Sequence, residues 1–160
     1  MMTQNQDTDI TSRRENMTTS RVLLVDDEAP FIDTLSKRLV KRGLTVSTAN
    51  SGQEALQKLG SGEAIDVIVL DVKMPGMDGI ETLKAIKNTN PLIEVIMLTG
   101  HATVGSAIDG MKLGALDYLM KPCDLDLLMA KVQEATMKKL KHEERINEAR
   151  ALQIALRRGD

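Results

Sequence analysis

Short apolar runs alternate with helical patterns along this chain, and that alternation most constrains its fold. Three of the runs contain no polar residue, at positions 22–25, 67–70 and 95–98. Such runs are typical of strands that are buried on both faces of a parallel sheet. Two further strands are predicted at 44–48, where polar and apolar residues alternate as on a half-exposed edge, and at 117–120.

Helical patterns fill the intervals between these strands. Phe31, Leu35 and Leu39 recur at every fourth position, and residues 51–54 (SGQE) match a capping box. Three more helices are predicted in the same way: Ile80, Leu83 and Ile86 after a capping Asp78; Val104, Ala107, Ile108 and Met111; Leu125, Leu128, Met129 and Val132 after a capping Asp124. Strand and helix thus alternate five times. This order predicts an α/β fold, a doubly wound parallel sheet with its site at the carboxyl ends of the strands.

The last helix is predicted to extend well beyond the sheet. Residues 125–158 contain no proline or glycine, and at about 1.5 Å per residue such a helix reaches roughly 50 Å. Its second half is highly charged but keeps a thin apolar seam, interrupted by Gln153, at Ile146, Ala149 and Leu156. The pattern leaves two readings open for residues 140–160: a solvated, charged helical extension, or a short coiled coil that binds a partner helix.

Composition excludes several classes of function. A net charge of -2 argues against a strongly basic nucleic-acid-binding protein, and two aromatic residues, Phe31 and Tyr118, are too few for a base-stacking platform. No apolar run approaches the roughly 18 residues of a membrane span. Residues 1–20 are polar and predict a disordered tail rather than a signal peptide. The single cysteine, Cys123, fits a reducing compartment, so we expect a cytoplasmic protein without membrane or direct nucleic-acid contacts.

The residues that end the predicted strands carry the chemistry. Asp26 and Asp27 follow the first strand, Asp71 the third, Thr99 ends the fourth, and Lys121 follows the fifth. A parallel sheet brings these ends to one edge, so three carboxylates, a hydroxyl and an ammonium group are expected in one crevice. Carboxylates about 5 Å apart repel by roughly 3 kcal/mol per pair at an effective dielectric constant near 20. A hard divalent cation bound through oxygen offsets that repulsion, and Mg²⁺ is the natural candidate.

Magnesium beside a lone carboxylate indicates phosphoryl transfer. The loose transition state needs its equatorial oxygens neutralised and its nucleophile held in line. We expect Asp71 to be the nucleophile and to form an aspartyl phosphate, while Mg²⁺, Lys121 and the Thr99 hydroxyl contact the phosphoryl oxygens. Any one of the acidic residues taken alone is better explained as a turn or capping residue. All five positions together are much harder to explain in that way.

Four motifs make the chain resemble the receiver domain of two-component response regulators over residues 21–139. They are, in order, 22–28 (VLLVDDE), 71–79 (DVKMPGMDG), 98–100 (LTG) and 117–122 (DYLMKP). The resemblance implies a flavodoxin-like (βα)5 sheet with the strand order 2-1-3-4-5, here followed by an extended C-terminal helix. It also implies a phosphoacceptor rather than an enzyme that turns over a separate substrate.

The resemblance assigns roles to the acidic residues. It implies that Asp71 accepts the phosphoryl group from a phosphohistidine on a sensor histidine kinase or a histidine phosphotransfer protein. It implies that Asp26 and Asp27 hold Mg²⁺ together with Asp71. The backbone carbonyl of Lys73 is implied as a further metal ligand.

The resemblance also implies how the signal is passed on. Thr99 and Tyr118 would be the switch pair, and a cis peptide bond would join Lys121 to Pro122, since an X–Pro bond is the one place where the cis form costs little. Lys73 and His101 flank the phosphoryl position and would tune the lifetime of the phosphate by admitting or blocking water.

The output is less constrained than the site. About twenty residues follow the receiver-like segment, too few for a helix-turn-helix domain. We therefore expect a stand-alone receiver that contacts a downstream protein or forms a homodimer, although residues 99–103 and 110–115 resemble receivers of the nitrogen-regulation class. A non-phosphorylated interaction or dimerisation module is the alternative. Nucleotide binding is disfavoured because residues 26–28 are acidic, and an aspartate phosphatase is disfavoured because Lys73 occupies the place of its second acid.

Overall fold

The computed structural model describes residues 19–158. Most of the predicted N-terminal tail, residues 1–18, therefore lies outside the described residues. The last residue of that predicted tail behaves differently from the expectation. Ser20 is 3% exposed, and its hydroxyl hydrogen bonds with the Thr136 hydroxyl at 2.7 Å.

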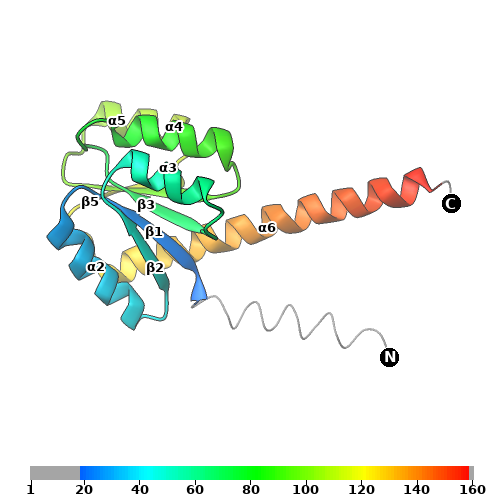
Figure 1. The fold of residues 1–160 in the computed structure, drawn as a ribbon, viewed down its shortest axis with the longest axis horizontal. Coiled ribbons are helices and arrows are strands. Elements are labelled where there is room, and N and C mark those ends of the chain that lie inside the picture. Colours follow the sequence, from blue (N-terminus) through cyan, green and yellow to red (C-terminus); the bar gives the residue numbers. More distant parts are fainter. Residues whose placement is uncertain (1–18, 159–160) are drawn as a thin grey trace.

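A five-stranded parallel sheet lies at the centre of the molecule (Figure 1). Its strands are β1 (Arg21–Val25), β2 (Thr45–Ala49), β3 (Val67–Leu70), β4 (Glu94–Thr99) and β5 (Asp117–Met120). The order β2-β1-β3-β4-β5 confirms the predicted flavodoxin-like topology. Every residue of β3 and β4 is buried, whereas β2 and β5 at the two edges are partly exposed, as the continuous and alternating sequence patterns predict.

Within residues 19–158, five helices cover the two faces of the sheet. They are α2 (Ala29–Lys41), α3 (Gly52–Gly60), α4 (Gly79–Thr89), α5 (Val104–Lys112) and α6 (Leu125–Arg157). Helices α3, α4 and α5 lie on one face, and α2 and α6 lie on the other (Figure 1). Each face buries its own apolar layer: Leu83 of α4 packs with Leu23 and Ile68 on one side, and Leu128 of α6 packs with Val22 on the other.

Two helix starts differ from the sequence prediction. The predicted capping box at α3 is only half formed, because Ser51 Oγ accepts from the Glu54 N–H at 3.1 Å but Glu54 accepts from the Asn50 N–H. A complete capping box lies instead at α5, where the Thr103 and Ser106 side chains each accept the other residue's backbone N–H. Ser106 accepts the hydrogen bond that completes this box. The sequence did not indicate the box, because the motif is usually identified by glutamate or glutamine at that position.

Helix α6 confirms the predicted extension with 33 residues. Its first half packs against the sheet through Leu128, Val132 and Ala135, and its second half projects away from the domain (Figure 1). All residues from 144 to 158 are exposed. Neither α6 nor any other helix within residues 19–158 combines the length and apolar character that a membrane crossing requires.

Two buried acids fix α6 to the amino edge of the sheet. Asp66, just before β3, accepts from the Arg21 backbone N–H at 2.9 Å and from Lys139 Nζ at 2.9 Å. Glu94, at the start of β4, is 2% exposed and lies 3.7 Å from the ammonium nitrogens of both Lys87 and Lys138. Two consecutive lysines of α6 therefore bind acids at the amino ends of two different strands.

These contacts predict how stability depends on pH. Burial alone would raise the pKa of Asp66, but the hydrogen bonds from Arg21 and Lys139 outweigh it and hold that pKa below the ordinary value of 3.8. A lowered pKa stabilises the folded state above about pH 3.8, and the contribution is lost as pH falls further. We expect Asp66→Asn to lower the free energy of unfolding by about 2 kcal/mol near neutral pH, with a difference that shrinks in acid.

The measurement is urea unfolding across the acid range. Asp33→Asn serves as the matched control, because Asp33 forms an exposed pair with Lys37 and its loss should change the unfolding free energy by less than about 0.5 kcal/mol. A loss for Asp66→Asn that stayed constant down to low pH would contradict the ionic explanation.

Candidate functional site

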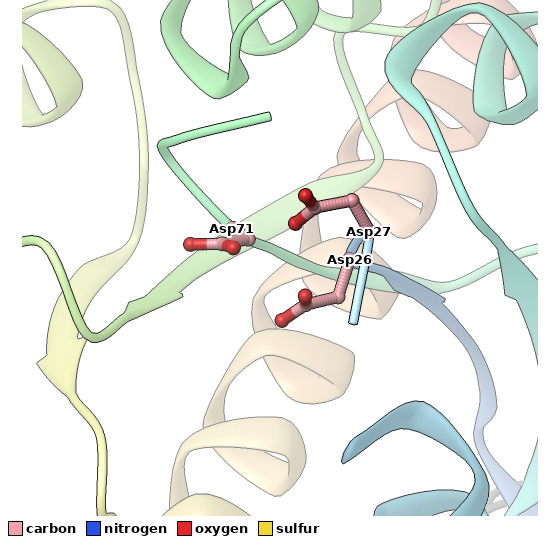
Figure 2. A group of neighbouring side chains, drawn as sticks. All are labelled: Asp26, Asp27 and Asp71. Carbon is pink, nitrogen blue, oxygen red and sulfur yellow. The ribbon is translucent and has the colours of Figure 1, made fainter. Parts of the chain in front are cut away.

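Three carboxylates meet at the carboxyl edge of the sheet (Figure 2). Asp26 and Asp27 follow β1, Asp71 follows β3, and carboxylate oxygens of all three lie within 4.8 Å of one another. Asp26 and Asp71 are buried, at 3% and 2% exposure, and Asp27 is exposed. The structure therefore brings together the three acidic residues that the strand-end argument selected.

Backbone hydrogen bonds hold these residues in place. The Asp26 N–H donates to the Ala49 carbonyl at 3.2 Å, and the Asp71 N–H donates to the Val25 carbonyl at 2.9 Å. These two bonds continue the backbone hydrogen bonding between the strands by one residue, into the site. The Glu28 N–H donates to Asp26 Oδ1 at 2.9 Å, which orients that carboxylate across the turn into α2.

Lys121 supplies the positive charge of the site. Its Nζ lies 2.6 Å from Asp26 Oδ2 and 3.9 Å from Asp71 Oδ2. The same nitrogen lies 3.9 Å from the centroid of the Phe31 ring, a cation–π contact that the sequence did not indicate. Lys121 begins the turn after β5, and the peptide bond that joins it to Pro122 is cis.

One lysine does not balance three carboxylates. Burial raises the pKa of Asp26, the hydrogen bonds from Lys121 and the Glu28 N–H lower it in part, and repulsion from Asp71 raises it again. Asp71 Oδ1 is buried and has no hydrogen-bond partner among the described residues. A buried oxygen with unused lone pairs, inside a cluster of carboxylates, fits a hard divalent cation such as Mg²⁺.

A glycine lets α4 approach the site closely. Gly79 begins α4, and its N–H donates to the Val72 carbonyl at 2.7 Å. A Cβ on Gly79 would overlap the carbonyl oxygen of Asp71 and lie 2.7 Å from the Val72 Cα. The position of Asp71 therefore depends on the absence of a side chain at the start of α4.

The remaining predicted residues lie around this centre. Thr99 ends β4 and is fully buried, and its hydroxyl oxygen accepts from the His101 N–H at 3.1 Å, which leaves its own O–H free to donate. His101 and Lys73 are both exposed. Lys73 lies in the loop between β3 and α4, so its backbone is within the segment that also presents Asp71.

Tyr118 of β5 is half-buried and tied to α5. Its hydroxyl hydrogen bonds with Ser106 Oγ at 2.7 Å, and Ser106 is the third residue of α5 and closes its capping box. Gly110 lies beside the ring, since a Cβ there would be 3.7 Å from Tyr118 Cδ2. Sequence reasoning selected Tyr118 but missed Ser106, because only the tertiary structure brings residues twelve positions apart into contact.

The Ser106–Tyr118 bond gives a direct prediction. Ser106→Ala should lower the free energy of unfolding by about 1 kcal/mol and increase the mobility of the Tyr118 ring. The protein has one tyrosine and no tryptophan, so the anisotropy of intrinsic fluorescence measures that ring alone. Thr103→Ala is the control, because it removes the cap but keeps Ser106. Equal loss of anisotropy in the two variants would show that the bond does not restrain the ring.

Comparison with known proteins agrees with this geometry. The sequence model of the family described as "Response regulator receiver domain" matches residues 22–133. The chain is 38% identical over 135 residues to transcriptional regulatory protein ZraR of Klebsiella oxytoca, a match that covers 84% of this chain and 30% of that protein. It is 40% identical over 114 residues to the DNA-binding transcriptional regulator NtrC of Escherichia coli (strain K12), covering 71% of this chain and 24% of that protein. The chain thus spans less than a third of the length of these curated relatives.

Solved structures show the same similarity. A CheY-like response regulator receiver domain protein from Methanospirillum hungatei JF-1 aligns with a TM-score of 0.73 and 30% identity, covering 78% of this chain and 98% of that one. The receiver domain protein from Clostridium thermocellum aligns with a TM-score of 0.71 and 36% identity, over 75% of this chain and 96% of that one. Fold, acidic site and sequence agree, and the chain belongs to the response regulator receiver domain family of two-component systems.

Proposed function

We propose that this receiver accepts a phosphoryl group on Asp71 from a phosphohistidine of a sensor histidine kinase or a histidine phosphotransfer protein. The observation that carries the proposal is the state of Asp71 itself. Its carboxylate is buried, one of its oxygens has no hydrogen-bond partner among residues 19–158, and Lys121 lies 3.9 Å from the other. An anionic nucleophile kept out of water beside a cation is suited to in-line attack on phosphorus.

The proposed transfer is a single in-line displacement at phosphorus. A carboxylate oxygen of Asp71 attacks phosphorus, the phosphorus–nitrogen bond to histidine breaks, and the histidine nitrogen keeps the electron pair. Mg²⁺, when bound, would supply the positive charge that neutralises the phosphoryl oxygens. Asp26, Asp27 and Asp71, with the backbone carbonyl of Lys73, are the proposed ligands.

Lys121 and Thr99 complete the proposed contacts to the phosphoryl group. The Lys121 ammonium already faces the site, and the Thr99 hydroxyl accepts from His101 in a way that leaves its proton for a phosphoryl oxygen. Donation by Thr99 would draw it toward the new charge. The Tyr118 ring would then move into the space that Thr99 leaves and change the surface of α5 and β5.

The proposed output is a change of protein contacts and not catalytic turnover. Lys73 and His101, which are exposed, are proposed to set the phosphate lifetime through the access of water to the aspartyl phosphate. The proposed targets are a downstream protein or a second copy of the chain. Its proposed compartment is the cytoplasm, in keeping with the single cysteine in the sequence.

Intact mass spectrometry tests the phosphoacceptor proposal. After incubation with acetyl phosphate and Mg²⁺, the wild-type chain is expected to gain one phosphoryl group, and Asp71→Asn or omission of Mg²⁺ should abolish the gain. Asp78→Asn is the control, because Asp78 caps α4 in the same loop but lies outside the acidic cluster. The aspartyl phosphate could hydrolyse before its mass is measured. Beryllofluoride, which mimics the phosphoryl group and does not hydrolyse in this way, is therefore added in a parallel experiment, and the fluorescence of Tyr118 is recorded.

Two outcomes without a mass gain distinguish a phosphoacceptor from a non-phosphorylated interaction module. A change in Tyr118 fluorescence with beryllofluoride but no mass gain would indicate rapid hydrolysis on a working acceptor. Neither a mass gain nor a fluorescence change, with Mg²⁺ binding confirmed, would overturn the proposal in favour of a receiver-like interaction module.

A further inference from the structure

The ammonium group of Lys121 has contacts of two kinds in the site. Three are with carboxylates: its Nζ lies 2.6 Å from Asp26 Oδ2, 3.9 Å from Asp71 Oδ2 and 4.0 Å from Glu28 Oε1. The fourth is with an uncharged group, because the same nitrogen lies 3.9 Å from the centroid of the Phe31 ring. At that distance the negative face of the ring attracts the ammonium group. An aromatic side chain therefore helps to hold the cation of the site.

Two of the three carboxylates have a second role. Asp26 and Asp71 are proposed ligands of Mg²⁺. A carboxylate that binds a dication has less charge left to attract an ammonium group, and the dication also repels that group. The attraction of Asp26 for Lys121 should therefore weaken when the site is loaded. Glu28 replaces little of it, since its side chain is 59% exposed and water screens such a pair.

Helix α2 fixes the position of the aromatic ring. Phe31 is the third residue of α2, and Pro30 before it lies in the first turn, where its fixed φ suits the start of a helix. Like Leu35 and Leu125, the ring packs against the apolar layer on the face of the sheet that α2 and α6 cover. A hard cation prefers oxygen ligands to an aromatic ring. The contact of the ring with Lys121 therefore stays available when the carboxylates bind metal.

From these contacts we infer that Phe31 is a positioning residue for Lys121, an inference that rests on the proposed function. The ring face keeps the ammonium group directed into the site while Asp26 binds Mg²⁺. The lysine is then already beside Asp71 when the phosphoryl group arrives, and its charge is available to a phosphoryl oxygen. Phe31 acts through Lys121 and not on the reacting atoms. Its loss should slow acceptance of the phosphoryl group without weakening the binding of Mg²⁺.

Proton NMR with saturating Mg²⁺ and no phosphodonor tests the position of the lysine. The ring current of Phe31 should shift the ε-methylene protons of Lys121 upfield of those of an exposed lysine such as Lys37. The upfield shift is expected to persist when chelator is replaced by Mg²⁺, and to be lost in Phe31→Leu. Absence of the upfield shift in Mg²⁺, whether or not it is present in chelator, would overturn the inference.

Fluorination of the ring tests its effect on the reaction. Phe31 is the only phenylalanine in the sequence, so biosynthetic incorporation of fluorinated phenylalanine changes position 31 alone. Fluorine withdraws electrons from the ring face and weakens its attraction for a cation, with little change in the shape of the ring. The rate of phosphorylation by acetyl phosphate at saturating Mg²⁺ should fall with each added fluorine, by about three- to tenfold for a trifluorinated ring. The affinity for Mg²⁺, measured by titration calorimetry, should not decrease.

Leu35→Ala is the matched control. Leu35 lies one turn after Phe31 on α2 and lines a cavity of about 220 Å³ together with it, so its truncation loosens the packing of α2 but keeps the ring. This variant should unfold at a lower temperature and react at nearly the wild-type rate. Phe31→Tyr, which keeps an aromatic face, should also react at nearly that rate. Equal slowing in Leu35→Ala and Phe31→Leu, or a rate independent of the number of fluorines, would overturn the inference.

Failure of the proposed function gives a different result. If the wild-type chain accepts no phosphoryl group, every rate in the fluorine series is zero and the proposed function fails. The proton resonances of Lys121 in Mg²⁺ still determine whether the ring holds the ammonium group, because that measurement needs no transfer. Phe31 and Leu35 are half-buried, and a thermal unfolding curve for each variant confirms that the domain remains folded.

Discussion

Replacing Lys121 by methionine is expected to lower the free energy of unfolding by about 3 kcal/mol at about pH 7 in the absence of divalent cations. The ammonium group lies 2.6 Å from Asp26 and 3.9 Å from Asp71, and both carboxylates are buried. Without it, two charges remain in the interior with no counterion. The pKa of Asp26, already raised by burial, should rise further.

The pH dependence has a defined sign. A carboxyl whose pKa is raised by folding costs no stability below its ordinary pKa of 3.8, and its cost increases as pH rises through the gap between the two values. The deficit of Lys121→Met should therefore shrink in acid. It should also shrink in saturating Mg²⁺. A cation that binds only the folded state stabilises it by RT ln(1 + [Mg²⁺]/Kd), and carboxylates that have lost the Lys121 ammonium are expected to bind Mg²⁺ more tightly than those of the wild type.

Urea unfolding with chelator and with Mg²⁺ measures both effects. Lys37→Met is the matched control, because Lys37 forms only an exposed ion pair with Asp33 and should change the unfolding free energy by less than about 0.5 kcal/mol. A deficit for Lys121→Met that was equal with and without Mg²⁺ would show that lysine and cation do not share the same carboxylates.

The second large effect is expected from Gly79→Ala. The new methyl group would overlap the Asp71 carbonyl and press on the Val72 Cα, and both are backbone atoms that no rotamer change can move aside. Either α4 or the end of β3 must shift. We expect the free energy of unfolding to fall by about 3 kcal/mol and acceptance of a phosphoryl group by Asp71 to fall at the same time.

Gly60→Ala is its control. Gly60 ends α3, and apart from its chain neighbours and the adjacent backbone of α3 no described atom lies within 4 Å of the position of its Cβ. Alanine there should leave stability unchanged or raise it by about 0.5 kcal/mol. If Gly79→Ala lost stability but kept the wild-type rate of reaction with acetyl phosphate, the close approach of α4 would matter for packing and not for the position of the nucleophile.

The strands were predictable because a strand that is buried on both faces consists of consecutive apolar residues, a pattern that is visible in the local sequence. The continuous runs at 67–70 and 95–98 lie in the sheet as expected, and the predicted strand at 44–48 is observed one residue later, at Thr45–Ala49. β4 begins earlier than predicted, at Glu94. A buried glutamate in a strand cannot be expected from local sequence, because Lys87 and Lys138, which face it, come from two separate helices.

The site was predictable for a topological reason. In a parallel sheet every strand ends at the same edge, so Asp26, Asp71 and Lys121 had to converge once the strands were identified. The contacts of Lys121 with Phe31 and of Tyr118 with Ser106 were not predictable, because they depend on how α2 and α5 sit on the sheet. Local pattern determines which residues reach the edge, and tertiary packing determines how they are restrained there.

Helix α6 is bound to the amino edge of the sheet near its middle, so a change in its angle there moves its free end like the arm of a lever. Its fulcrum is the pair Lys138 and Lys139, bound to Glu94 and Asp66, and the arm from there to Arg157 is about 27 Å long. A tilt of about 10° at the fulcrum would displace the tip by roughly 5 Å. A change of angle that is small at the amino edge therefore becomes a displacement about as wide as a side chain at the far end of α6.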